Sequence, residues 1–110
     1  MQAGKRSDRI TFQRQSVSDD GYGNVMSNWS NLLTCWADML ERLGGEKIQS
    51  GALEAPRLAT IRVLRAPETL AVTEADRIVA RGQTWNIRSI AAVGRANEEL
   101  EMLCETQVAT

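Results

Sequence analysis

The sequence contains no histidine among its 110 residues. This absence excludes a Ser-His-Asp triad, a Cys-His dyad and a histidine-ligated metal site within one chain. Its only cysteines, Cys35 and Cys104, form no CxxC motif, so zinc and thioredoxin-like sites lack their minimum ligands. We expect both cysteines to be reduced core thiols, because free cysteine is often buried, with a single disulfide as the alternative. The chain is therefore expected to be no enzyme and to hold no metal or cofactor.

An excess of charge of either sign is also missing. The chain has 13 Lys and Arg against 14 Asp and Glu, a formal charge of -1. Tight nonspecific binding to DNA needs clustered basic residues that displace counterions from phosphates, so this balance argues against it. Long apolar runs are absent too, because Asn, Ser and Gly interrupt the uncharged residues 21–37. The basic first residues, MQAGKRSDR, lack the apolar stretch of a signal peptide, so we expect a cytoplasmic protein, or part of a particle assembled in the cytoplasm, and no membrane contact.

Alternating apolar and polar residues are present along much of the chain, and this pattern predicts strands. In residues 57–65, for example, Ala59, Ile61 and Val63 share one face. The predicted strands cover residues 8–15, 57–65, 77–81, 84–90 and 100–108. Their number and spacing, with a single domain expected over residues 1–110, predict a mainly β fold: a small antiparallel barrel or sandwich.

The segments between these strands are predicted from their turn-forming residues. Residues 16–24, rich in Ser, Asp, Gly and Asn, are predicted to form a loop. Gly82–Gln83 is predicted to be a tight hairpin turn. Asp76, at the start of a predicted strand, is interpreted as an ordinary turn residue.

Residues 29–43 fit both helical spacing and a strand buried on both faces, and the local pattern alone favours a helix. Trp36 and Trp85 fall within apolar patterns and are predicted to lie in the core. Trp29 is instead a candidate exposed anchor for a partner, because tryptophan is enriched at interface hot spots.

The near-zero net charge hides two regions of opposite sign. The first fourteen residues hold four basic side chains against one Asp, and residues 95–105 hold four Glu against one Arg. Either this is an ordinary solvated surface, or subunits stack and use complementary charges to fix their register. The candidate stacking charges are Lys5, Arg6, Arg9, Glu98, Glu99 and Glu101.

Five pieces of the sequence, in this order, resemble the phage head–tail joining or head-closure family, also called stopper or head–tail adaptor proteins. They are MQAGKRSDRITFQR, DDGYGNVMSNWSNLLTCWADM, ATIRVLR, DRIVARGQTWNIRSI and ELEMLCET. The third resembles the strand that follows a mobile segment in the family, and the last resembles its closing strand. Two departures are Trp85, where the family more often has Tyr, and RLATIRVLR, which lacks an aromatic after its arginine.

The resemblance implies an SH3-like or sandwich-like β-barrel with a long loop or short helix, and it favours a strand over a helix around Trp36. It implies a structural virion protein at the head–tail interface. There the chain would form a ring, matching a twelve-fold connector, between the portal or adaptor protein and the tail or tail-terminator protein. The ring would close the DNA channel, provide a tail docking surface and meet passing double-stranded DNA without sequence specificity.

In related stoppers the segment after the Trp36 strand projects into the channel, so residues 44–57 are a candidate gate or ring contact; an ordinary surface loop is the alternative. The candidate residues are Gly44, Gly45, Glu46, Lys47, Ile48, Ala52 and Leu53. Two other functions stay open: a tail-completion or tail-terminator protein, and a small OB- or SH3-like binding module. The module would need a basic groove with exposed aromatics, for which Trp29 is the one candidate.

Overall fold

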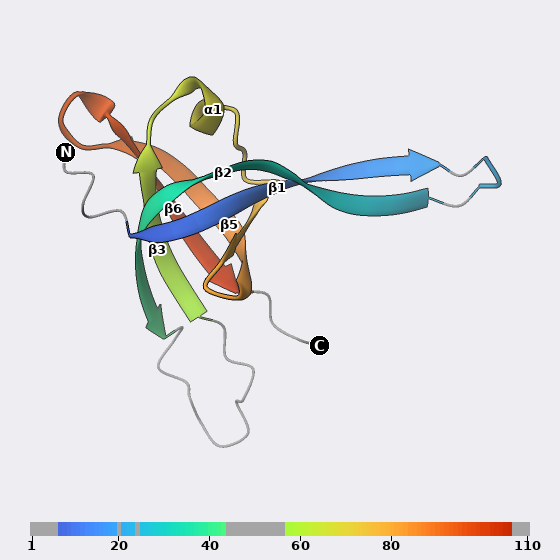
Figure 1. Ribbon diagram of the computed structural model, residues 1–110, viewed down its shortest axis with the longest axis horizontal. Helices are drawn as coiled ribbons and strands as arrows, with labels where there is room; N and C mark the ends of the chain where they lie inside the picture. Colours follow the sequence, from blue (N-terminus) through green and yellow to red (C-terminus); the bar gives the residue numbers. More distant parts are fainter. Residues whose placement is uncertain (1–6, 20, 24, 44–56, 107–110) are drawn as a thin grey trace, which may run out of the picture.

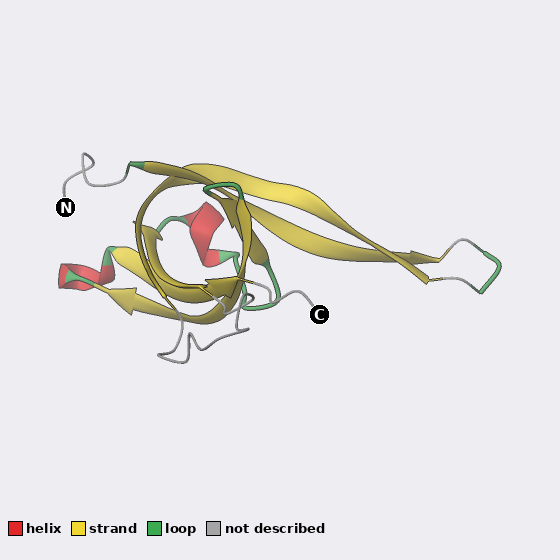
Figure 2. Ribbon diagram, turned by 90° about the horizontal axis from the view of Figure 1, so that it is seen from below, coloured by secondary structure: helices red, strands yellow, loops and turns green. Residues whose placement is uncertain are grey.

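The computed structural model describes residues 7–19, 21–23, 25–43 and 57–106. Within these residues, six strands close into an antiparallel barrel in the order β1-β2-β3-β6-β5-β4 (Figures 1 and 2). This confirms the predicted mainly β barrel with a short helix. The elements are β1 (Asp8–Asp19), β2 (Val25–Leu43), β3 (Arg57–Leu64), the helix α1 (Pro67–Leu70), β4 (Arg77–Ala80), β5 (Gln83–Val93), the 3-10 turn η2 (Arg95–Asn97) and β6 (Glu99–Thr106).

The barrel interior is filled by the apolar side of each alternating strand. Trp85, Phe12, Ile10, Ile61, Ile78, Met102 and Val63 are the largest fully buried side chains. The Trp85 indole Nε1 donates a hydrogen bond to the Ala80 carbonyl oxygen at 3.1 Å, which satisfies its polar atom inside the core. The predicted core position of Trp85 and the shared face of Ala59, Ile61 and Val63 in β3 are confirmed.

Both cysteines are free, so the disulfide alternative is wrong. Cys104 is buried, and this burial raises the pKa of its thiol to about 12. The thiol therefore stays protonated and unreactive at neutral pH. Cys35 is only half-buried, so the expected core position is confirmed for Cys104 alone.

Residues 29–43 lie within a strand, so the helix favoured by the local pattern is wrong and the strand implied by the resemblance is correct. Because side chains alternate across a barrel wall, Ala37 and Met39 face the core and Trp36 faces outward. Trp36 is 50% exposed, with the Arg9 guanidinium 5.3 Å from its ring centroid. The prediction that Trp36 belongs to the core is therefore wrong.

The β4–β5 hairpin turns one residue earlier than predicted. Arg81 and Gly82, with φ of 51° and 73°, occupy its centre, so Gln83 already belongs to β5. A two-residue turn with two positive φ angles matches the twist of the flanking strands. The Arg81 guanidinium also bridges the carboxylates of Asp8, at 2.7 Å, and Glu41, at 2.8 Å, and so ties β1 and β2 to this turn.

The longest departure from the predicted fold is a two-stranded ribbon that leaves the barrel (Figure 1). β1 pairs with β4 only at residues 11–13, but its ladder with β2 continues from Arg14, opposite Ser30, to Asp19, opposite Val25. We call residues 14–19 and 25–30 the arm. The predicted loop over residues 16–24 is thus wrong for residues 16–19, because cross-strand hydrogen bonds to β2 hold these polar residues in a strand.

Candidate functional site

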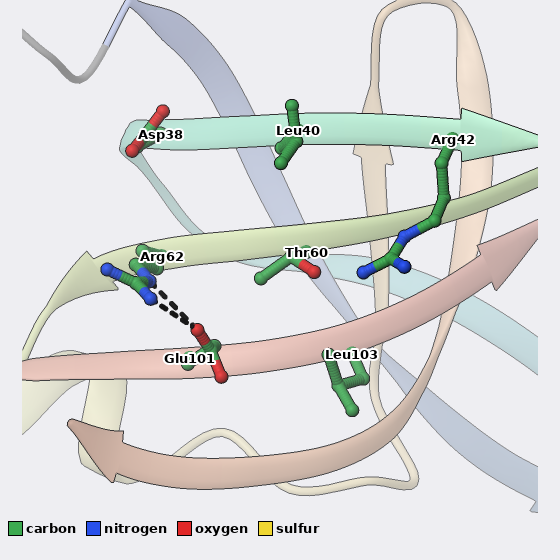
Figure 3. A pocket seen from close by; sticks show the side chains of 7 residues that line it. All are labelled: Asp38, Leu40, Arg42, Thr60, Arg62, Glu101 and Leu103. Atoms are coloured by element: carbon green, nitrogen blue, oxygen red, sulfur yellow. Dashed lines mark hydrogen bonds and ion pairs between the residues drawn. The ribbon is translucent and has the colours of Figure 1, made fainter.

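The outer surface of β2, β3 and β6 carries apolar side chains where a solvated sheet would carry polar ones. Leu40 of β2, Thr60 of β3 and Leu103 of β6 lie side by side on one rung of the sheet. Leu40 is 68% exposed and Leu103 is 45% exposed. A groove of about 490 Å³ runs over them (Figure 3). We call its lining the outer face: Asp38, Leu40, Arg42, Thr60, Arg62, Glu101 and Leu103.

Charged side chains frame this apolar strip. At one end Arg62 Nη2 lies 2.7 Å from Glu101 Oε2. At the other end Arg42 lines both this groove and a second one of about 370 Å³, which continues along β3 and β6. Over the described residues, Arg42 forms no ion pair with a carboxylate. An apolar centre with a charged rim is the composition of a protein–protein interface.

Where the arm leaves the barrel, two arginines fix its direction. Arg14 donates from Nε and Nη2 to the two carboxylate oxygens of Asp76, each at 3.0 Å, and from Nη2 to the Ala71 carbonyl oxygen at 2.7 Å. On the other face of β1, the Arg77 guanidinium lies 4.1 Å from the Trp29 ring centroid, and its Nε donates to Gln13 at 2.8 Å. The arm is therefore anchored by side chains at its base as well as by its backbone ladder.

Asp76 closes a turn with Thr73, as the sequence suggested, but it is also a buried member of this anchor, with 3% of its surface exposed. Burial alone would raise the pKa of its carboxyl, but the hydrogen bonds from Arg14 and from the Thr73 backbone outweigh burial and lower that pKa below 3.8. The ionised carboxylate is thus the form that the fold stabilises. The sequence offers only a weak signal for this ion pair, because Arg14 and Asp76 lie far apart along the chain.

Replacing Asp76 with asparagine is expected to destabilise the fold at neutral pH by about 1–3 kcal/mol, since the charged hydrogen bonds to Arg14 are lost. The wild-type contribution is complete above pH 3.8 and is lost as the pH falls through the lowered folded-state pKa. The difference between the two proteins should therefore shrink in acid. Urea unfolding at several pH values measures it, with the exposed Glu74→Gln as control. An equal difference at all pH values would contradict the assignment.

The residues singled out from the sequence are scattered over the barrel. Trp29 is half-buried beneath Arg77. Arg9 on β1 and Glu101 on β6 lie on strands that are not neighbours in the barrel, so these two described members of the charged regions do not lie side by side. Glu98 and Glu99 lie at the start of β6. Lys5, Arg6 and the candidate gate, Gly44, Gly45, Glu46, Lys47, Ile48, Ala52 and Leu53, lie outside the described residues.

The outer face cannot be recognised from the sequence, because Leu40 and Leu103 have the hydropathy of core residues. Their exposure follows only from the register, which points Met39 and Cys104 inward. No group of three metal-binding side chains occurs among residues 7–19, 21–23, 25–43 and 57–106. In the same part of the chain, no helix is long and apolar enough to cross a membrane.

The described residues thus form a closed barrel with an apolar outer face and a projecting arm, surfaces of the kind that proteins use to bind other proteins. Comparison with known proteins agrees: the family model of the phage head completion protein matches residues 1–107. The chain belongs to the phage head completion protein family, and is therefore a structural virion protein that acts in head completion.

Two solved structures share the fold. A chain in the virion of a native gene transfer agent particle is 21% identical, with a TM-score of 0.68, over 92% of this chain and 94% of that one. A protein from Shigella flexneri 2a, known from a solution structure, is 25% identical, with a TM-score of 0.67, over 96% of each chain. Among curated proteins, none matches the sequence.

Proposed function

We propose that this chain completes the head by forming a ring between the portal or adaptor protein and the tail. In this position it closes the DNA channel and offers a docking surface to the tail or tail-terminator protein. Head completion is the role of the family, and the ring and its neighbours are the proposed means. The ring is expected to match the symmetry of the connector on which it sits.

The outer face is the observation that carries this proposal. Leu40 and Leu103 expose apolar surface on either side of Thr60, and Arg42, Arg62 and Glu101 surround them. A subunit in a ring needs two different surfaces that complement each other, because a ring is built from head-to-tail contacts. The separated charges of Arg9 and Glu101 support register between such surfaces.

The near-neutral charge of the chain also suits a channel component. Each phosphate that a protein neutralises tightens its hold on DNA, and a ring around a passing duplex must not trap it. With 13 basic and 14 acidic residues the chain meets this requirement. Contact with double-stranded DNA is therefore proposed to be steric and independent of sequence.

Imaging of assembled particles at residue resolution tests the position of the chain. The proposal expects a ring of copies between the portal or adaptor and the tail. Density for this chain on the tail side of the terminator would instead identify a tail-completion protein and overturn the proposal.

Residues 44–57 are proposed to close the channel after packaging. Deleting residues 46–54 is expected to leave the chain in the particle but to reduce the fraction of heads that retain DNA, because the ring would lose the part that obstructs the duplex. Counting full and empty heads by electron microscopy measures this, with a Gly-Ser segment of equal length as a second variant. Normal DNA retention in both variants would remove the gate from the proposal.

A further inference from the structure

The arm and the outer face both expose apolar side chains on the described chain, and they complement each other. We propose that the arm of one copy docks into the outer-face groove of the next copy. This inference rests on the proposed ring and names the contact that would close it. The two surfaces belong to the same chain, so their pairing is head-to-tail.

The arm and the turn that joins its two strands present apolar side chains and a carboxylate. Val17 is 66% exposed, and Tyr22, in the turn between the two strands, is 88% exposed. Asp19, at the end of β1, is also exposed, and its side chain accepts a hydrogen bond from the Gly21 backbone at 2.8 Å. A ligand with this composition fits an apolar groove in which Arg62 is paired with Glu101 and Arg42 has no carboxylate partner among the described residues.

The outer face supplies such a groove. Leu40 and Leu103 form its apolar floor on either side of Thr60, and Arg42 stands at one end without a carboxylate partner among the described residues. Val17 or Tyr22 of a neighbouring copy would cover the two leucines. Asp19 of that copy would then pair with Arg42, which would satisfy both charges.

The geometry directs the arm to another copy. Figure 1 shows the arm pointing away from the barrel, so it does not lie on its own outer face. The six residues of β1 within the arm span about 20 Å at the rise of an antiparallel strand. This length carries the exposed side chains well beyond the barrel wall. A neighbouring subunit can therefore receive them while its own arm extends to the next.

The anchored base of the arm lowers the entropic cost of this contact. Arg14 with Asp76, and Arg77 with Trp29, hold the arm in one direction before docking. A preorganised segment loses less conformational entropy when it binds. Two-stranded ribbons with both edges open are only marginally stable in water, so docking would also stabilise the arm in its paired form.

Cysteine cross-linking within particles tests the contact. One chain carries Val17→Cys, and a second, differently tagged chain carries Thr60→Cys, which leaves both leucines in place. The two are co-expressed, and the particles are treated with a short bifunctional thiol reagent. We expect a cross-linked product that contains both tags. Particles holding only one of the variants should give no product above the wild-type background, which comes from the half-buried Cys35. Gln15→Cys, on the same side of β1, repeats the test with Val17 intact.

Each other outcome overturns the inference in a recognisable way. Products from Val17→Cys alone mean arm-to-arm pairing, and products from Thr60→Cys alone mean face-to-face pairing. A cross-link from Thr60→Cys to a different virion protein gives the groove another occupant. If imaging shows the ring but both arm variants remain uncross-linked, the docking is wrong and the proposed function stands. If the wild-type chain is missing from the connector, the proposed function itself fails.

Discussion

Trp85→Ala is expected to destabilise the barrel by about 3–5 kcal/mol, the usual cost of removing a large buried aromatic side chain. Trp85 is fully buried, and its indole donates to the Ala80 carbonyl oxygen. Domains of this size are stable by about 5–15 kcal/mol, so the variant should lose much of that margin. Urea unfolding followed by circular dichroism measures it as a lower midpoint with an unchanged slope.

Trp36→Ala is the matched control, because it removes the same side chain from the outer surface. Trp36 is 50% exposed, and the Arg9 guanidinium forms a cation–π contact with its ring. An exposed cation–π contact contributes about 0.5–1 kcal/mol, so the expected loss is no larger than this. Equal losses for the two tryptophans would contradict the register of β2.

Leu40→Glu combined with Leu103→Glu is expected to abolish incorporation of the chain into particles while leaving the isolated chain folded. Both side chains face outward, so the new carboxylates stay hydrated in the monomer. In an interface they would replace the apolar centre with two buried charges. Hot-spot residues contribute about 2 kcal/mol or more each, so two lost contacts predict at least about a 100-fold weaker association. Quantifying the chain in purified particles by immunoblot measures this.

Leu70→Glu provides the control for this surface. Leu70 is 52% exposed, but it lies on α1 and not on the outer face. Its variant should enter particles at the wild-type level. If all three glutamate substitutions lower incorporation equally, added negative charge is the cause, and the outer face has no special role.

The barrel was predictable wherever one strand face is buried and the other solvated. In β3, buried Ala59, Ile61 and Val63 alternate with more exposed neighbours, and this pattern is readable in the sequence. β2 was ambiguous because Trp36 and Leu40 are apolar on its outer side, which removes the alternation and mimics a helix. The family resemblance indicates a strand for β2, because a resemblance carries information about the fold that hydrophobic periodicity lacks.

The surfaces proposed for assembly were less predictable. The Ser, Asp and Gly residues after Gln15 are typical of a loop, yet pairing with β2 extends β1 to Asp19. The bond between Arg14 and Asp76 joins segments that meet only once the barrel has closed. Local sequence therefore indicates neither the arm nor its anchor. An outward leucine becomes recognisable as part of an interface only when the register is known.

Particle production without this chain tests its role in head completion most directly. Particles made by a strain that lacks the coding sequence are compared by electron microscopy with those made after complementation. We expect heads that have lost their DNA and tails that remain unattached, with DNA-filled tailed particles restored by complementation. Filled, tailed particles at the normal yield in the absence of the chain would contradict a role in head completion.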